Sequence, residues 1–243
     1  MHPFFLLFSR FLRSFPIIQA LKIFKTCKYS FFMHPLQKTI LSWYEQYGRK
    51  LPWRETQDPY KILVSEMMLQ QTQVDRVIPK YHAFLQRFPT RQSLAEASPA
   101  EILQYWSGLG YNRRALYLHA CVQALAKQKD FPEQVEELQK LPGLGPYTAA
   151  AVLSFALNKD VVVVDVNIAL LFKRIFFPRR DVERIAQEVL PLGRSRDWHN
   201  ALMDIGSLYC HRKKPDCVSC PLQKMCASAS DEKKITTTRD TKK

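Results

Sequence analysis

The chain has 243 residues, of which 47% are hydrophobic and 24% charged, a composition typical of a globular protein with a buried core. With only 7 glycines and few alternating β-branched runs, the composition argues against an all-β fold. No stretch reaches the ~18 uninterrupted apolar residues of a membrane span, so we expect no membrane partner. The formal net charge of +14 favours a polyanionic partner, foremost a nucleic acid.

The first 32 residues differ in composition from the rest of the chain. They are rich in aromatic and basic residues and contain no acidic residue. A secretory signal would carry its charge before the apolar run, whereas an organelle transit peptide would fit this pattern. The alternative, which we favour, is that Met33 is the true start. Residues 1–32 are therefore not expected to belong to the fold, and a prokaryotic chain is expected to be cytoplasmic and nucleoid-associated.

From Leu36 onward the apolar residues follow a helical spacing, which predicts an all-α fold. Asp58 followed by Pro59 is typical of a helix start, with a capping residue and then proline at the first helical position. Residues 161–164 are the only strand-like run and are too few to indicate a sheet. Helices are expected over residues 36–47, 59–70, 73–88, 99–106, 112–127, 133–140, 146–157, 166–176, 182–191 and 197–209.

Residues 134–157 are predicted to form two helices joined by a glycine-rich turn. Gly143 and Gly145 would let the backbone approach a phosphate, and the next helix, with Thr148 in its first turn, would present free N–H groups. This arrangement suits binding of DNA without reading its sequence. An ordinary turn between helices could contain the same glycines, so their context decides the interpretation.

Four of the six cysteines are clustered with the spacing C-x6-C-x2-C-x5-C. Clustered thiolates bind either zinc or an iron–sulfur cluster, and the spacing alone leaves both open. A disulfide framework would need an oxidising compartment, which nothing in the sequence indicates. The predicted metal ligands are Cys210, Cys217, Cys220 and Cys226.

The first loop of the cysteine cluster carries consecutive cationic side chains, which are either solvated or in contact with DNA. We favour the DNA contact, for Arg212, Lys213 and Lys214. After the cluster the chain becomes polar and charged. This composition predicts a folded domain over residues 33–227 and a disordered basic tail over residues 228–243.

Together these motifs resemble the helix–hairpin–helix DNA glycosylases of the endonuclease III superfamily. The hairpin LPGLGPYTAA, the downstream Asp165 and the cysteine spacing carry the resemblance. Within the superfamily, the MutY-type adenine glycosylases are most similar, through LPWR (51–54), DPYKILVSEMMLQQTQV (58–74), GLGY (108–111) and ALMDIG (201–206). The resemblance implies two helical lobes with a DNA-binding cleft between them, and a 4Fe–4S cluster on the four cysteines.

A DNA glycosylase must flip its base out of the duplex, protonate it and stabilise an oxocarbenium-like sugar. Glu66 shares a predicted helix face with apolar residues, and burial would raise the pKa of its carboxyl. By resemblance, Glu66 protonates the adenine. From the sequence alone Asp165 is a helix cap, whereas the resemblance makes it the carboxylate that stabilises the sugar, with Asn167 orienting the water or the intermediate.

Tyr147 stands where lyase-active relatives carry a lysine that forms a Schiff base, so the resemblance implies hydrolysis without efficient strand cleavage. Val166 departs from the glycine expected between Asp165 and Asn167, so the local backbone is expected to differ. Gln71 matches the residue that wedges into the duplex. The other DNA contacts implied by the resemblance are Arg54, Gln70 and Tyr111.

The resemblance thus implies a monomeric, monofunctional enzyme that excises adenine opposite guanine or 8-oxoguanine in mispaired double-stranded DNA. MutY-type enzymes usually continue into a domain that recognises 8-oxoguanine, and few residues follow Cys226. A separate lesion-recognition partner is therefore one expectation. The alternatives are a thymine or uracil glycosylase for mismatches with guanine, against which Glu66 argues, a non-catalytic iron–sulfur DNA-binding protein, and a zinc-stapled module.

Overall fold

The computed structural model describes residues 34–179 and 181–229. Expectations for residues 1–32 and for the tail beyond residue 229 lie outside the described residues. Within the described part every regular element is a helix, which confirms the all-α prediction. None of these helices is long and apolar enough to cross a membrane.

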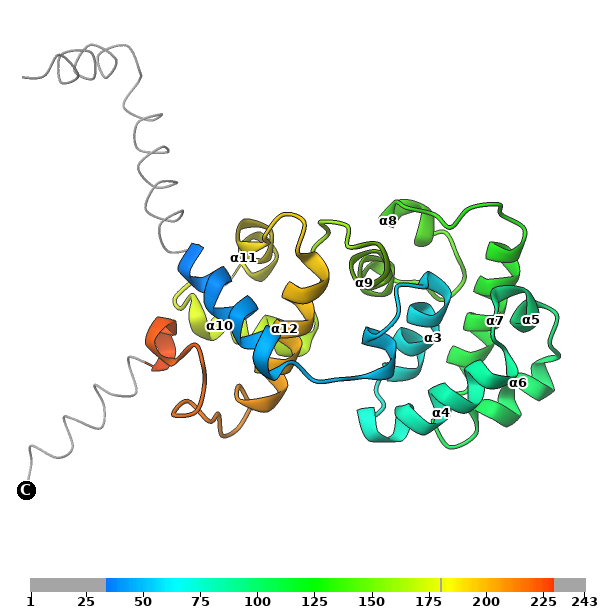
Figure 1. Cartoon of the computed structure of the whole chain (residues 1–243), viewed down its shortest axis with the longest axis horizontal. Coiled ribbons are helices and arrows are strands. Elements are labelled where there is room, and N and C mark those ends of the chain that lie inside the picture. The colour runs from blue at the N-terminus through cyan, green and yellow to red at the C-terminus, as the bar shows by residue number, and fades with distance from the viewer. Residues whose placement is uncertain (1–33, 180, 230–243) are drawn as a thin grey trace, which may run out of the picture.

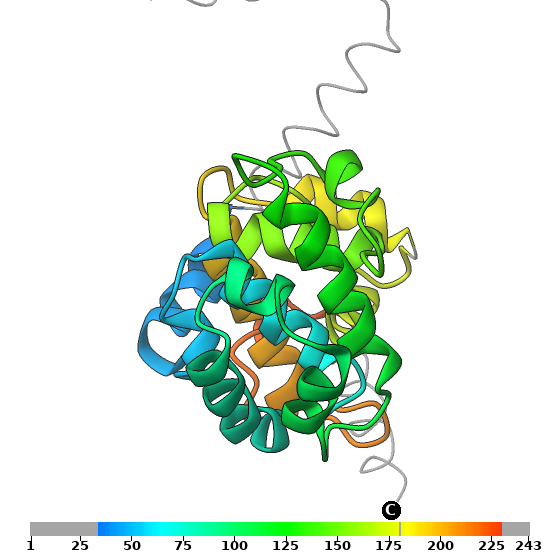
Figure 2. The ribbon, with the colours of Figure 1, turned by 90° about the vertical axis from the view of Figure 1, so that its right-hand side faces the viewer.

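The central part of the chain forms one lobe around a single apolar core (Figure 1). Helix α3 (Pro59–Leu69) is buried on nearly all sides because α4, α7 and α9 pack around it. Figure 2 views the fold from this lobe, whose helices lie in front of the other lobe. Its remaining elements are η1 (Pro52–Arg54), α4 (Val74–Arg87), α5 (Arg91–Ala95), α6 (Pro99–Trp106), α7 (Arg113–Ala126), α8 (Val135–Leu138) and α9 (Pro146–Leu157).

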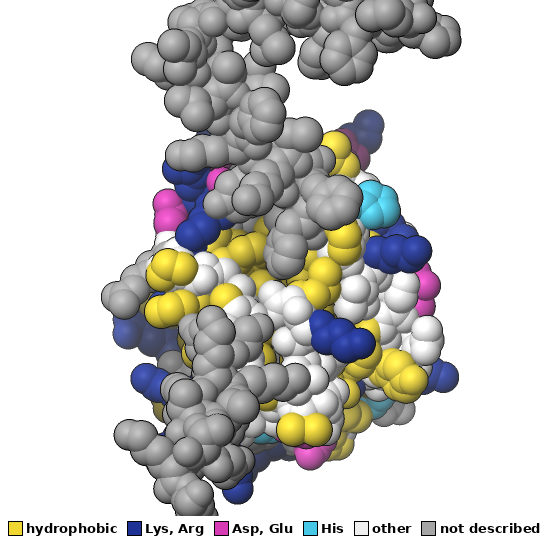
Figure 3. All heavy atoms as spheres, turned by 90° about the vertical axis from the view of Figure 1, so that its left-hand side faces the viewer, with side chains coloured by type: hydrophobic (Ala, Val, Ile, Leu, Met, Phe, Trp, Pro, Cys, Tyr) yellow, Lys and Arg dark blue, Asp and Glu magenta, His cyan; other side chains and the backbone are white. Residues whose placement is uncertain are grey.

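The second lobe combines the two ends of the described chain. The helix over residues 34–47 contributes Leu36, Ile40 and Trp43 to a core that it shares with the elements after residue 165. Lys and Arg side chains are spread over the outer end of this lobe, around an area of hydrophobic side chains (Figure 3). Its other elements are α10 (Val166–Ile175), α11 (Val182–Val189), α12 (Ser195–Leu208) and η2 (Gln223–Met225).

The predicted helices are all present, with small shifts at their ends. Asp58 caps α3 as expected, since its Oδ1 accepts a hydrogen bond from the backbone N–H of Tyr60 at 2.9 Å. Residues 161–164 form no strand. The sequence analysis missed α5, which is too short to show a helical period and is marked only by the capping box of Thr90 and Ser93.

The fold continues past residue 227. Residues 227–229 are helical, and Ala229 is buried. The Ser228 hydroxyl donates a hydrogen bond to the backbone carbonyl of Arg174 at 3.0 Å. Ser228, the first residue of the predicted tail, is therefore bound to α10, and the residue after it is buried.

Candidate active site between the two lobes

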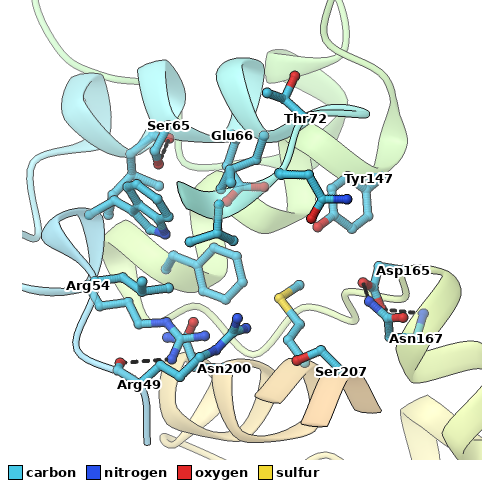
Figure 4. Close-up of a pocket in the computed structure, with 18 of the residues that line it drawn as sticks. Arg49, Arg54, Ser65, Glu66, Thr72, Tyr147, Asp165, Asn167, Asn200 and Ser207 are labelled. Atoms are coloured by element: carbon cyan, nitrogen blue, oxygen red, sulfur yellow. Dashed lines mark hydrogen bonds between the residues drawn. The ribbon is translucent and has the colours of Figure 1, made fainter. Parts of the chain in front are cut away.

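A pocket of about 590 Å³ lies between the two lobes and brings the four predicted catalytic residues together (Figure 4). The central lobe contributes Glu66 from α3 and Tyr147 from the first turn of α9. Asp165 and Asn167 enter from the start of α10. The far wall is formed by α12, through Arg196, Asn200, Met203 and Ser207.

Glu66 is buried, with 8% of the residue exposed, as the apolar face of its helix predicted. Burial, and secondarily the negative charge of Asp165, raise the pKa of Glu66 to about 7. The positive charge of Arg54 and a hydrogen bond with Tyr147 act in the opposite direction. Glu66 can therefore hold a proton near neutral pH and release it to a group in the pocket.

Asp165 caps α10 and lines the pocket at the same time. Its Oδ1 accepts hydrogen bonds from the backbone N–H groups of Asn167 at 3.0 Å and Ile168 at 2.7 Å. Its Oδ2 accepts from the Asn167 side-chain amide at 3.0 Å. Burial raises the pKa of Asp165 while these hydrogen bonds oppose the rise. Val166, in the expected glycine position, adopts ordinary helical backbone and is 83% exposed.

The segment that leads to Asp165 is held in place by α12. The backbone N–H of Val163 donates to Nε2 of His199 at 3.1 Å, and Nδ1 of His199 lies 2.8 Å from the carbonyl of Ser195. Burial lowers the pKa of His199 to about 4, so the ring stays neutral and Nε2 can accept. The sequence analysis missed His199, because no spacing links it to Val163.

Arg54, a predicted DNA contact, directs its guanidinium to a buried carboxylate. Its Nη1 and Nη2 donate to Asp204 at 2.7 and 2.9 Å. Arg49 binds the same carboxylate, from its side-chain Nε at 2.5 Å and its backbone N–H at 2.9 Å. Asp204 belongs to the ALMDIG motif, which carried the resemblance but received no role in the sequence analysis.

Gln71 and Tyr111 lie beside one groove of about 430 Å³ on the central lobe, together with Gly143. Both residues have left-handed backbone, with φ of 55° and 48°, which is strained for side chains other than glycine. Tyr111 is 65% exposed. The side chain of Gln70 instead donates to the Thr148 hydroxyl at 3.3 Å, which ties α3 to the hairpin.

One buried arginine, Arg114 of α7, joins the two loops that present Gln71 and Tyr111. Its Nη1 donates to the carbonyls of Met67, Met68 and Gln70 at 2.6–2.9 Å. Its Nη2 donates to the Thr72 hydroxyl and to the carbonyls of Leu109 and Gly110 at 3.0–3.2 Å. This role was not predicted from the sequence, because five of the six acceptors are backbone carbonyls and leave no side-chain pattern.

The two glycines of the hairpin act differently. Gly143 has φ +76°, and an added Cβ would lie 2.5 Å from Cβ of Tyr117, so only glycine fits there. Gly145 caps α9 with an ordinary φ of −80° and open space beside it. Thr148 is buried, so its side chain is turned away from the surface on which the predicted phosphate contact would lie.

The four predicted metal-binding cysteines line one cavity of about 180 Å³. Arg174 of α10 donates from Nη1 to Sγ of Cys210 at 3.1 Å and to the carbonyl of His211 at 3.0 Å. Burial raises the pKa of the Cys220 thiol to about 11. Among the described residues, no group of three His, Cys, Asp or Glu side chains has the geometry to hold a single metal ion. The neighbouring Arg212, Lys213 and Lys214 are exposed.

Residues 64–192 match the family model of the HhH-GPD superfamily base excision DNA repair proteins, and the chain belongs to this superfamily. It is 38% identical to the adenine DNA glycosylase of Buchnera aphidicola subsp. Baizongia pistaciae, over 81% of this chain and 59% of that protein. It is 41% identical to the adenine DNA glycosylase of Mycolicibacterium smegmatis, over 75% of this chain and 66% of that protein. The chain thus spans about three fifths to two thirds of these relatives.

Solved structures confirm the fold. A thermostable thymine-DNA glycosylase matches with a TM-score of 0.76 and 27% identity, over 83% of this chain and 98% of that chain. The predicted two-lobed glycosylase architecture is therefore confirmed.

Proposed function

We propose that this protein is a monofunctional DNA glycosylase that removes adenine mispaired with guanine or 8-oxoguanine in double-stranded DNA. The observation that carries the proposal is a carboxyl group with a pKa of about 7, Glu66, in one pocket with a hydrogen-bonded carboxylate, Asp165. An acid for the leaving base and an anion for the sugar are the two groups that this hydrolysis needs. The identity of 38–41% to adenine DNA glycosylases supports the choice of adenine.

In the proposed reaction, protonated Glu66 gives its proton to a ring nitrogen of the flipped adenine. The bond between the base and the sugar C1′ then breaks, with its electron pair leaving on the adenine. The Asp165 carboxylate stabilises the positive charge that develops on the sugar. Water adds to C1′ and its released proton returns to a carboxylate, which leaves free adenine and an abasic site.

Tyr147 limits the chemistry to hydrolysis. Its hydroxyl is hydrogen-bonded with Glu66, and its pKa is raised well above the usual value by burial and by the two nearby carboxylates. A neutral phenol cannot form a Schiff base with C1′, as a lysine does. Base release is therefore expected to leave the DNA strand intact until alkali is added.

We further propose that Cys210, Cys217, Cys220 and Cys226 hold a 4Fe–4S cluster. Four thiols that line one cavity provide the donor set of such a cluster, and the guanidinium of Arg174 would stabilise the negative charge on the Cys210 sulfur. The cluster would supply a cross-link that fixes the loop carrying Arg212, Lys213 and Lys214, which is where these cations would meet phosphates. Iron and sulfide analysis of anaerobically purified protein tests this assignment, and stoichiometric zinc without iron would contradict it.

The test of the proposed activity is single-turnover base release from matched duplexes, with hot alkali revealing abasic sites. Adenine is placed opposite guanine, 8-oxoguanine or cytosine, and thymine or uracil opposite guanine. We expect adenine release opposite guanine or 8-oxoguanine, and its loss in Glu66→Gln with duplex binding retained. Thymine or uracil release would instead identify a mismatch glycosylase, as in the solved thymine-DNA glycosylase.

A further inference from the structure

Asp204 is a fully buried carboxylate that the proposed reaction does not use. Burial alone would favour its neutral form, but the hydrogen bonds and charges of Arg54 and Arg49 outweigh burial and lower its pKa. Asp204 therefore carries a negative charge inside α12, the helix whose other side chains form the far wall of the pocket that contains Glu66.

Arg54 binds this carboxylate and lines the same pocket as Glu66. Its side chain is 9% exposed, and two of its nitrogens are bound by Asp204. Its Nε is buried and has no hydrogen-bond partner among the described residues. The positive charge of Arg54 also reaches Glu66, where it favours the ionised carboxylate. Without Asp204, this charge would act on Glu66 uncompensated.

We propose that Asp204 is a positioning residue that acts through Arg54: by neutralising the guanidinium, it lets Glu66 keep its proton at neutral pH. The inference rests on the proposed role of Glu66 as the acid that protonates the base. It gives the ALMDIG motif a function in the reaction in addition to its place in the packing of α12.

The other groups that face Glu66 do not substitute for this pair. Asp165, at the start of α10, raises the pKa of Glu66, and Tyr147 of α9 lowers it through a hydrogen bond. On the α12 side, the guanidinium of Arg196 is turned to the carbonyl of Ala156 at 2.6 Å. Arg49 is half-exposed and turned to Asp204. Arg54 is therefore the cation that matters here: the extent to which Asp204 neutralises its charge sets the fraction of Glu66 that is ionised.

The charges predict shifts of opposite sign for two substitutions. Asp204→Asn leaves the positive charge of Arg54 uncompensated near Glu66. We expect this substitution to lower, by about one unit, the pH above which the rate of adenine release falls, which is the effect of a nearby opposite charge. Arg54→Met removes that cation and is expected to raise the same pH. The double variant Arg54→Met/Asp204→Asn removes both charges and should return close to the wild-type profile.

The experiment measures each variant in two ways. The first is the pH profile of single-turnover adenine release from an adenine–guanine duplex. The second is the ¹³C NMR titration of the Glu66 carboxyl in protein labelled at glutamate, assigned with Glu66→Gln. Asp197→Asn is the matched control: it lies on the same helix, in an exposed pair with Arg194, and should move neither quantity.

Opposite shifts in the two single variants and their cancellation in the double variant support the proposal. A rate reduced equally at every pH, with an unchanged Glu66 titration, would overturn it and leave Asp204 a purely structural role. Should Asp204→Asn fail to fold, the double variant still decides, because a profile equal to that of Arg54→Met would show that the charge of Asp204 does not reach Glu66. If NMR shows the shifts but the wild type releases no adenine, the proposed function fails and the charge coupling stands.

Discussion

Glu66 and His199 are two buried side chains whose charged forms destabilise the folded state, Glu66 as pH rises and His199 as pH falls. Glu66 keeps a proton up to about pH 7 in the folded state, and the unfolded chain loses it near pH 4.5, so its contribution to stability falls as pH rises through this window. In the folded state His199 stays neutral down to about pH 4, whereas in the unfolded chain it is protonated near pH 6.5. Its contribution to stability therefore falls as pH drops through this window. The two pH windows overlap and the two contributions have opposite signs, so wild-type stability should change little within the overlap.

The substitution Glu66→Gln removes the pH-dependent contribution of Glu66 to the free energy of unfolding. We expect the variant to be inactive and more stable than the wild type at pH 8, by up to about 3 kcal/mol, because the folded state no longer pays for an ionised buried carboxylate. The advantage should shrink towards pH 5. Urea unfolding at both values checks this, and an equal difference at the two pH values would contradict the assigned ionisation.

At the scale of the elements, α12 fixes the segment that delivers Asp165. His199→Asn removes the Nε2 acceptor of the Val163 N–H, at a cost of about 1–3 kcal/mol for a buried unpaired donor. The variant should therefore be less stable at pH 7.5, and its stability should rise as pH falls from 6.5 towards 4.5, because the contribution of Glu66 is then no longer opposed by that of His199. Urea unfolding at pH 7.5 and 5 measures both effects, and a variant whose stability is as flat between these pH values as that of the wild type would exclude the assigned role of His199.

Helix α7 is the second element that positions functional residues, because Arg114 in its first turn holds the loops that carry Gln71 and Tyr111. Arg114→Lys replaces a planar guanidinium that bridges six acceptors with a single ammonium, so the loops carrying Gln71 and Tyr111 lose their common anchor. We expect at least a tenfold slower base release and a weaker 2-aminopurine signal for base flipping. Arg113→Lys, at the adjacent exposed position, is the control. Equal behaviour of the two variants would remove Arg114 from base flipping.

The elements were more predictable from the sequence than the connections between them. Helix positions follow from local apolar spacing and from caps such as Asp58, and the burial of Glu66 follows from the face of its own helix. The partners of Asp204 lie about 150 residues away along the chain, and those of Arg114 are, apart from the Thr72 hydroxyl, backbone carbonyls. Neither set of partners leaves a periodic signal in the sequence, so these contacts emerge only from the folded structure: those of Arg114 within the central lobe and those of Asp204 with the segment before α3.

For the whole molecule, a net charge of +14 predicts duplex binding that weakens steeply with salt, because phosphate contacts release counterions. Lys213→Gln/Lys214→Gln should flatten the logarithmic salt dependence by up to about two units, one for each lost phosphate contact. Lys127→Gln/Lys129→Gln removes the same charge at the opposite end of α7 from Tyr111 and serves as the control. Fluorescence anisotropy between 50 and 300 mM salt, roughly the range over which such slopes are resolved, measures both. Identical slopes for the two variants would show that the loop carrying Lys213 and Lys214 does not contact the DNA.

The second lobe is closed by segments made at very different times. The helix over residues 34–47 buries Leu36, Ile40 and Trp43 against α10 and α12, whereas the core of the central lobe lies within residues 51–163. At synthesis rates of roughly 5–20 residues per second, the helix over residues 34–47 waits on the order of 10 s for α12. The central lobe can fold in that interval while the apolar face of the helix over residues 34–47 is still uncovered. A ribosome-associated chaperone that binds exposed apolar surface would therefore meet this chain at the helix over residues 34–47.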